Sequence, residues 1–158
     1  MSAREPTAGR PRFPPGYGIS DSTDGMLPWS WAVDRLDGAR NYWVVTAGST
    51  GKPHAMPVWG LWFDDGVLFS TSSDSRKGRD LAADPRAVVH LESGDEVVVL
   101  EGEVASVTLD ERMADAYEEK YSYRPEPGQG LWFLLAPTVA YCWLESDYPR
   151  TATRFVFG

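Results

Sequence analysis

The sequence has very few of the side chains that bind metals or form covalent links. It contains one cysteine, Cys142, and two histidines, His54 and His90, among 158 residues. A single cysteine cannot form a disulfide within the chain and is typical of the reducing cytoplasm. So few Cys and His residues argue against a zinc site and leave little material for a catalytic triad. If the protein performs chemistry, we expect a bound cofactor to supply it.

Long apolar runs and an excess of positive charge are also missing. No stretch of about 18 apolar residues occurs, so we expect no membrane-spanning helix. The first residues lack the apolar core of a secretory signal, which together with the lone cysteine predicts a cytoplasmic protein. Asp and Glu number 23 against 15 Lys and Arg, a net charge of −8. This acidity argues against nucleic acid as a partner, because such binding depends on cations that displace counterions.

Apolar and aromatic surface is what the chain has in quantity. Hydrophobic residues make up 42% of it, and seven residues are Trp, which is enough for one domain with a real core. Residues 1–27 are rich in Pro, Gly, Ser, Asp and Arg, which predicts a flexible, loosely packed N-terminal arm. We expect residues 28–158 to form the folded domain.

Three helices are expected. The first begins near Pro28, an acceptable first-turn residue, and ends at Gly38. A short one over 76–83 stops at the following Asp-Pro pair. The third begins at a capping box over residues 108–111 and carries apolar and aromatic residues at four-residue spacing.

Strands dominate the rest of the chain, where alternating apolar residues are separated by Gly- and Asp-rich turns. They are expected at 41–47, 54–63, 67–71, 87–91, 96–107, 131–141 and 151–157. Gly102 predicts a bulge, Pro57 an interruption that puts part of the strand over 54–63 at an edge or bulge, and Pro137 a break in its strand. Six or seven antiparallel strands with a few short helices predict a mainly β fold, a small closed barrel.

A polar turn ahead of the second helix is the most informative segment. It contains Thr71, Ser72 and Ser75, and the helix begins with Arg76 and Lys77. Free backbone N–H groups, hydroxyls and cations therefore meet at one helix N-terminus, which is the composition of a phosphate site. In so acidic a chain, this predicts one local anion. The alternative is an ordinary capped surface helix, because Ser and Asp are common caps, and the local sequence leaves both readings open.

A second candidate segment is His54-Ala55-Met56-Pro57-Val58-Trp59-Gly60. Proline within a strand leaves partner backbone groups unpaired, and the edge of a ligand ring can take those hydrogen bonds. Trp59 is a candidate wall for such a pocket, and Gly60 allows close approach. The alternative is an edge strand with a buried Trp, which these residues alone favour.

Three further side chains have ordinary explanations that outweigh the functional ones. His54 is a candidate substrate contact but is typical of a strand start that faces solvent. Lys120 could reach an anionic ligand, yet a solvated charged helix face explains it better. Arg154 could contact an acidic cofactor tail or pair with a surface carboxylate, and the second is favoured.

Taken in order, these segments resemble the split β-barrel flavin- and deazaflavin-dependent oxidoreductases related to pyridoxamine 5′-phosphate oxidase. The resemblance runs from about residue 27 to residue 158. No single motif is decisive, but the ordered set is fairly specific. The matching segments are 41–46, 51–60, 75–77, 84–85, 101–102, 120–121 and 153–155.

The resemblance implies a homodimer with cofactor sites at the subunit interface, and hydride transfer between the cofactor and a small organic substrate. It implies that the strand with Met56, Pro57, Val58 and Trp59 lies along the cofactor ring. It also implies which residues hold the cofactor phosphate: Thr71, Ser72, Ser75, Arg76 and Lys77. The Trp-rich strand and the Thr-Arg-aromatic ending are closer to the branch that uses F420, so F420 is the first choice of cofactor and FMN the second.

One departure bears on that choice, because Gly78-Arg79-Asp80 stands where Ala-Arg-Asn is expected. No side chain is assigned a catalytic role, and no metal is expected. A non-catalytic protein that binds or carries a flavin, a deazaflavin or haem is the rival interpretation, since the ring-binding residues would be the same. A purely structural barrel is the third.

Overall fold

A computed structural model describes residues 4–158, which contain nine strands, four α-helices and one short 3-10 helix. The helices are α1 (Trp29–Gly38), α2 (Arg76–Ala83), α3 (Glu111–Tyr121) and α4 (Tyr148–Thr151), with the 3-10 turn η1 at Glu145–Asp147. The strands are β1 (Thr7–Gly9), β2 (Tyr42–Thr46), β3 (His54–Val58), β4 (Gly60–Phe63), β5 (Gly66–Thr71), β6 (Arg86–His90), β7 (Glu96–Val107), β8 (Leu131–Leu144) and β9 (Thr153–Val156).

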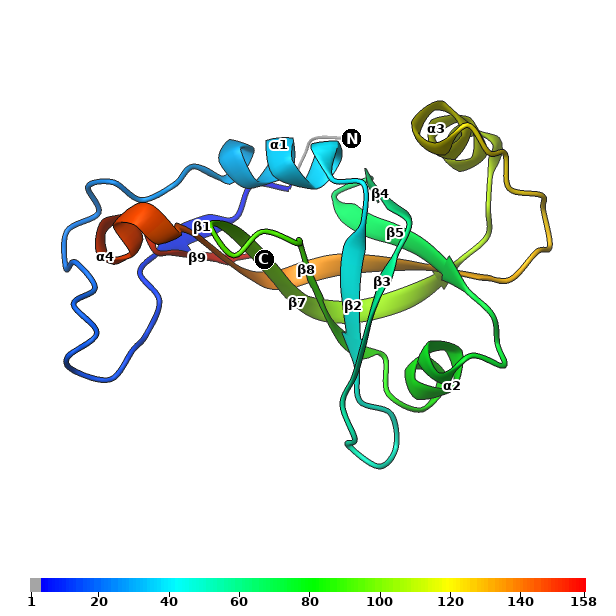
Figure 1. Cartoon of the computed structure of the whole chain (residues 1–158), viewed down its shortest axis with the longest axis horizontal. Helices are drawn as coiled ribbons and strands as arrows, with labels where there is room; N and C mark the ends of the chain where they lie inside the picture. Colours follow the sequence, from blue (N-terminus) through cyan, green and yellow to red (C-terminus); the bar gives the residue numbers. More distant parts are fainter. Residues whose placement is uncertain (1–3) are drawn as a thin grey trace.

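All the strands belong to one antiparallel sheet that curves into a barrel (Figure 1). Its order is β1-β9-β8-β7-β6-β2-β3, and β5 pairs with both β4 and β8. The long strand β8 pairs with β7 along its length, with β5 over its first part and with β9 over its last. The predicted mainly β, antiparallel barrel is therefore confirmed. Among residues 4–158, none of the helices combines the length and apolarity that crossing a bilayer requires.

The strand count exceeds the predicted six or seven for two reasons. The segment 54–63, predicted as one strand, is divided at Trp59 into β3 and β4, and the predicted arm supplies β1. A Cβ atom on Gly60 would lie 2.7 Å from the Leu68 carbonyl oxygen. Only glycine therefore allows the backbone to turn this corner so close to β5.

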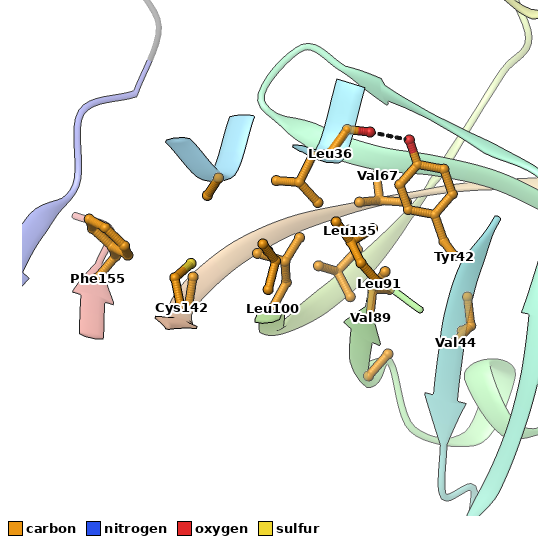
Figure 2. Packing of buried hydrophobic residues seen from close by; sticks show 14 of the residues in the cluster. Leu36, Tyr42, Val44, Val67, Val89, Leu91, Leu100, Leu135, Cys142 and Phe155 are labelled. Atoms are coloured by element: carbon orange, nitrogen blue, oxygen red, sulfur yellow. Dashed lines mark hydrogen bonds between the residues drawn. The ribbon is translucent and has the colours of Figure 1, made fainter. Parts of the chain in front are cut away.

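The barrel interior holds the main core, and its inner face follows the alternation seen in the sequence. Tyr42, Val44 and Thr46 of β2 are buried, while the residues between them are partly exposed. Helix α1 packs its buried Leu36 against this core, and the Tyr42 hydroxyl donates to the Leu36 carbonyl (Figure 2). Cys142 lies in the same core, where burial raises the pKa of its thiol to about 12. This thiol is inert packing material.

A second core joins α3 to the outer side of β4, β5 and β8. The buried residues of this core are Leu61, Leu68, Met113, Tyr117, Tyr121 and Trp132. The predicted four-residue spacing along α3 is thus confirmed, but its predicted capping box is wrong. The N-cap is Asp110, whose carboxylate accepts the Met113 N–H at 2.8 Å. The helix begins after Asp110, because this carboxylate satisfies the free N–H groups of the first turn.

The irregularity predicted at Gly102 is confirmed in position, but the extra residue is Thr138 on β8, and the break predicted at Pro137 is wrong. The register between β7 and β8 shifts at Glu101 and Gly102, and β8 continues through Pro137 opposite this shift. A Cβ on Gly102 would lie 2.5 Å from the Ala136 carbonyl oxygen. The bulge absorbs the ladder irregularity that proline creates, so the strand does not end there.

The predicted loosely packed N-terminal arm needs correction for part of its length. Strand β1 pairs with β9, and the Leu27 N–H donates to Thr153 Oγ1 at 2.9 Å. The Arg10 guanidinium donates to the backbone carbonyls of four residues, Ser22, Asp24, Arg150 and Ala152. These contacts have no periodic signal in the sequence, because they join segments far apart in the chain. Residues 1–3 of the predicted arm lie outside the described residues.

We predict that Arg10→Ala lowers the free energy of unfolding by about 1–3 kcal/mol, because it leaves several carbonyl groups without their donors. The measurement is the midpoint of urea unfolding. The matched control is Arg12→Ala, an exposed arginine without a side-chain hydrogen bond among the described residues, which should change stability by less than about 0.5 kcal/mol. Equal midpoints for the two variants would contradict the anchoring role of Arg10.

Candidate functional site

The turn before α2 is built by its own hydroxyl groups. Ser75 is the N-cap of α2, and its Oγ accepts the Gly78 N–H at 3.0 Å and donates to the Ser72 carbonyl at 2.7 Å. Thr71 Oγ1 lies 2.7 Å from the same Ser75 oxygen. Ser75 is therefore the helix cap that the alternative describes, while its contact with a phosphate stays a prediction. These contacts fix the turn in place at the N-terminus of α2, where the first N–H groups of a helix lack intrahelical partners.

Gly78 allows α2 to press directly on this turn. A Cβ atom on Gly78 would lie 2.2 Å from the Ser72 carbonyl oxygen, which is backbone and cannot move aside cheaply. The glycine that departs from the expected Ala is therefore required by packing. Asp80 has a comparable role, because its carboxylate accepts the Thr46 hydroxyl at 2.8 Å and ties α2 to β2.

The three cations at the start of α2 have different surroundings. The Arg76 guanidinium donates to the Lys52 carbonyl at 3.1 Å and lies 3.8 Å from the Asp80 carboxylate. Arg79 donates to the carbonyl of Asp74. Lys77 is partly buried and makes no side-chain hydrogen bond or ion pair within residues 4–158. Of the predicted phosphate cations, Lys77 is the one left available for an anion.

Strand β3, which the resemblance places along the cofactor ring and which we call the ring strand, is an edge strand. In the described part of the chain it pairs only with β2. Met56 is 48% exposed, Pro57 is exposed, and Val58 is partly buried. Trp59 is 41% exposed. Of the alternative, an edge strand with a buried Trp, the edge strand is therefore correct and the buried Trp is wrong. Side-chain and backbone groups along this edge are therefore accessible to a ligand.

Arg76 brings the two predicted parts of the site together. Its bond to Lys52, and a longer one to the Pro53 carbonyl at 3.5 Å, connect the start of α2 with the residues that lead into β3. The polar turn and the ring strand thus belong to one continuous region of the protein. Arg154 does not join it, because four strands of the sheet order lie between β9 and β3.

A cavity of about 370 Å³ adjoins the polar turn. It is lined by Thr71 and Ser72, by the loop that contains Gly130, and by Trp132. The indole N–H of Trp132 is buried and has no hydrogen-bond partner among the described residues. Another cavity, of about 420 Å³, lies within the N-terminal loop over residues 10–21 and contains none of the predicted site residues.

Sequence reasoning missed the environment of Lys120. Instead of lying on a solvated face, this side chain is partly buried, and its Nζ donates to the Gly60 carbonyl at 2.8 Å and the Tyr42 hydroxyl at 3.1 Å. Burial lowers the pKa of Lys120 to about 8, although Asp37 opposes that shift. The sequence signal for this burial was Tyr121, which lies on the buried face of α3. Its neighbour Lys120 is thereby brought close to Gly60.

Comparisons with known proteins show the family of the chain. A family model described as pyridoxamine 5′-phosphate oxidase matches residues 32–143. The pyridoxine/pyridoxamine 5′-phosphate oxidase of Acidothermus cellulolyticus is 37% identical over 121 residues, which cover 71% of this chain and 50% of that protein. That of Cupriavidus pinatubonensis is 40% identical over 85 residues, covering 52% and 38%. The chain belongs to the pyridoxamine 5′-phosphate oxidase family, and it spans half or less of the length of these curated relatives.

Solved structures show the same fold at lower identity. A conserved hypothetical protein from Mycobacterium tuberculosis has a TM-score of 0.68 at 21% identity, covering 80% of this chain and 90% of that one. An F420 reductase has a TM-score of 0.55 at 16% identity, covering 68% of this chain and 93% of that one. HutZ, a haem storage protein from Vibrio cholerae, has a TM-score of 0.58 at 13% identity, covering 80% of this chain and 92% of that one. The family resemblance and the predicted split-barrel fold are therefore confirmed.

The low pKa of Lys120 predicts a pH dependence of stability. Above about pH 8 the folded protein has released this proton, whereas the unfolded chain retains it up to about 10.5, so the free energy of unfolding rises with pH in this window. Lys120→Met removes the effect. We expect the difference in unfolding free energy, wild type minus variant, to increase by at most about 1 kcal/mol from pH 7 to 9.5, because solvent screens a partly exposed group.

The measurement is urea unfolding of both proteins at several pH values. The tyrosine and cysteine titrations occur in both proteins, so they cancel in the difference. A difference that stays constant across the window would contradict the lowered pKa.

Proposed function

We propose that this protein is an oxidoreductase that uses a flavin-type cofactor, F420 or FMN, and transfers hydride between that cofactor and a small organic substrate. The observation that carries the proposal is the pairing of an available Lys77, at a capped helix N-terminus, with the accessible edge strand β3. Membership of the pyridoxamine 5′-phosphate oxidase family supports it.

The residues of the turn fit a phosphate group. The first N–H groups of α2 have no partner within the helix, and their partial positive charge favours an anion. Lys77 supplies a full positive charge beside them, while Ser75 and Gly78 hold the turn against the helix. We therefore assign phosphate binding to the backbone of this turn, Ser72 and Lys77, and give Thr71, Ser75 and Arg76 the task of shaping it.

Strand β3 fits the ring of the same cofactor. Met56 and Trp59 present apolar and aromatic surface, and the free edge of the strand offers backbone donors and acceptors to a heterocycle. When bound, the cofactor supplies the hydride chemistry. The chain's own residues bind and orient it and exclude water from one side of its ring.

We place FMN ahead of F420 in this proposal, which reverses the order expected from the sequence. The curated relatives bear the name of pyridoxine/pyridoxamine 5′-phosphate oxidases, whose family usually binds FMN. The likeness to an F420 reductase is at 16% identity and supports the fold alone. Asp80 in place of the expected Asn, engaged with Thr46, points the same way.

The test is a titration of the purified apo-protein with FMN and, separately, with F420, followed by ligand fluorescence. Binding of either cofactor, followed by turnover of its reduced form with an added acceptor, supports the oxidoreductase. Tight binding without turnover favours the alternative of a carrier protein. Haem is titrated in parallel by absorbance, since HutZ and a haem-binding protein from Mycobacterium smegmatis share the fold. Failure to bind either FMN or F420 overturns the proposal, and haem binding alone would favour the carrier alternative.

We predict that Lys77→Ala weakens cofactor binding about ten- to a hundredfold, the effect of losing one charge-assisted contact, while the fold survives. The control is Arg79→Gln, which removes an exposed cation of the same helix that already donates to Asp74. It should change the affinity by about twofold or less. Unchanged affinity in Lys77→Ala would remove the phosphate assignment.

We further propose that the protein is a homodimer and that the outer face of β2 and β6 forms its interface. Trp43, Val45, Val88 and His90 are only partly buried on this face, and the Trp43 and His90 rings stack at 6.0 Å. Val45 and Val88 also line a cavity of about 400 Å³. Apolar surface of this kind is typical of a surface that a second copy covers.

Val88→Glu is therefore expected to halve the mass in solution, from twice 17.5 kDa to 17.5 kDa, with an unchanged circular dichroism spectrum. Light scattering after size exclusion measures the mass. Ser30→Glu, on the exposed side of α1, serves as the control and should leave the dimer intact. A monomeric wild type would contradict the proposal.

A further inference from the structure

The corner between β3 and β4 is held by two side chains from the end of α3. The Tyr121 hydroxyl accepts the Gly60 N–H at 2.9 Å and donates to the Arg40 carbonyl at 2.7 Å. Lys120 donates to the Gly60 carbonyl at 2.8 Å and to the Tyr42 hydroxyl at 3.1 Å. Both sides of residue 60 are thus bound by neighbouring residues of one helix.

The same tyrosine holds one face of the exposed indole beside this corner. The rings of Trp59 and Tyr121 stack with centroids 4.5 Å apart and an interplanar angle of 7°. The Arg40 guanidinium lies 5.4 Å from the Trp59 centroid and 5.5 Å from that of Tyr121. A group equidistant from two stacked rings stands beside the stack, so Arg40 does not cover the indole face that points away from Tyr121.

We propose that Lys120 and Tyr121 are positioning residues of the cofactor site, which hold Gly60 and thereby fix the indole of Trp59 at the end of β3. The inference rests on the proposed function, because it takes the cofactor ring to lie along β3. Neither residue touches the cofactor in this account. Each acts through Trp59, whose partly exposed indole lies where β3 ends.

The choice of side chains supports a positioning role over simple packing. The other buried residues of α3 are Met113, Ala114 and Tyr117, and none of them makes a side-chain hydrogen bond among the described residues. Lys120 instead brings a charge into a partly buried place, which costs stability at neutral pH. An apolar residue would fill the same space without that cost, but it could not hold the Gly60 carbonyl.

The experiment compares two tyrosines on one face of α3. Tyr121→Phe keeps the ring and its stack but removes the bonds to Gly60 and Arg40. Tyr117→Phe is the matched control, since Tyr117 is equally buried and its hydroxyl has no hydrogen bond within residues 4–158. We expect Tyr121→Phe to weaken binding of FMN, or of F420 if that is the cofactor bound, by about fivefold or more. Tyr117→Phe should change it by less than about twofold.

A double-mutant cycle tests whether Tyr121 acts through Trp59. In a Trp59→Leu background, Tyr121→Phe should weaken cofactor binding by less than about twofold, because the indole it positions is gone. Additive losses, or equal losses from Tyr121→Phe and Tyr117→Phe, would overturn the inference.

A third readout does not need the cofactor. The indole Nε1–H signal of Trp59, assigned in ¹⁵N–¹H spectra by its absence in Trp59→Leu, should shift in apo Tyr121→Phe and stay in place in Tyr117→Phe. Lys120→Met should shift it as well and replaces Tyr121→Phe if that variant does not fold. An unmoved signal overturns the positioning role even where cofactor binds. A shifted signal in a protein that binds neither FMN nor F420 leaves the positioning intact and refutes the proposed function alone.

Discussion

The close approach of the backbone at Gly60 is the constraint on which the candidate site depends. Because no Cβ atom fits between this residue, Leu68 and Tyr42, the chain can turn there from an edge strand into the barrel wall. The turn leaves β3 with one free edge and places Trp59 outside the core. A continuous strand over 54–63 would have enclosed the same residues in the sheet and removed the accessible edge.

The polar turn before α2 shows how a binding site is prepared by interactions that do not involve the ligand. Ser75 and Gly78 hold the turn against the helix. Arg76 and Asp80 form hydrogen bonds with Lys52 and Thr46 of the hairpin that leads to β3. Most of the conspicuous polar groups are therefore occupied within the protein. Such prior ordering reduces the entropy that a ligand must lose on binding, and it leaves Lys77 as the group with freedom to respond to an anion.

Membership of a family does not by itself fix the reaction. The same barrel occurs in an F420 reductase and in a haem storage protein, at identities that carry the fold alone. The chain also spans half or less of its curated relatives. Function must be argued from particular residues, and here these are Lys77, beside the arginine that contacts the start of β3, and Trp59 at the end of β3.

Hydrophobic alternation, caps and turn residues are local signals, so the sequence alone predicts the antiparallel barrel, the helix over 76–83, the irregularity at Gly102 and the grouping of candidate residues into two segments. It did not reveal the division at Trp59, the strand β1, or the burial of Lys120. Those depend on contacts between segments tens of residues apart, such as Arg10 with Arg150 and Lys120 with Gly60. Which charged side chains form hydrogen bonds within the protein, and which remain available to a ligand, depends on these long-range contacts and is seen in the folded structure alone.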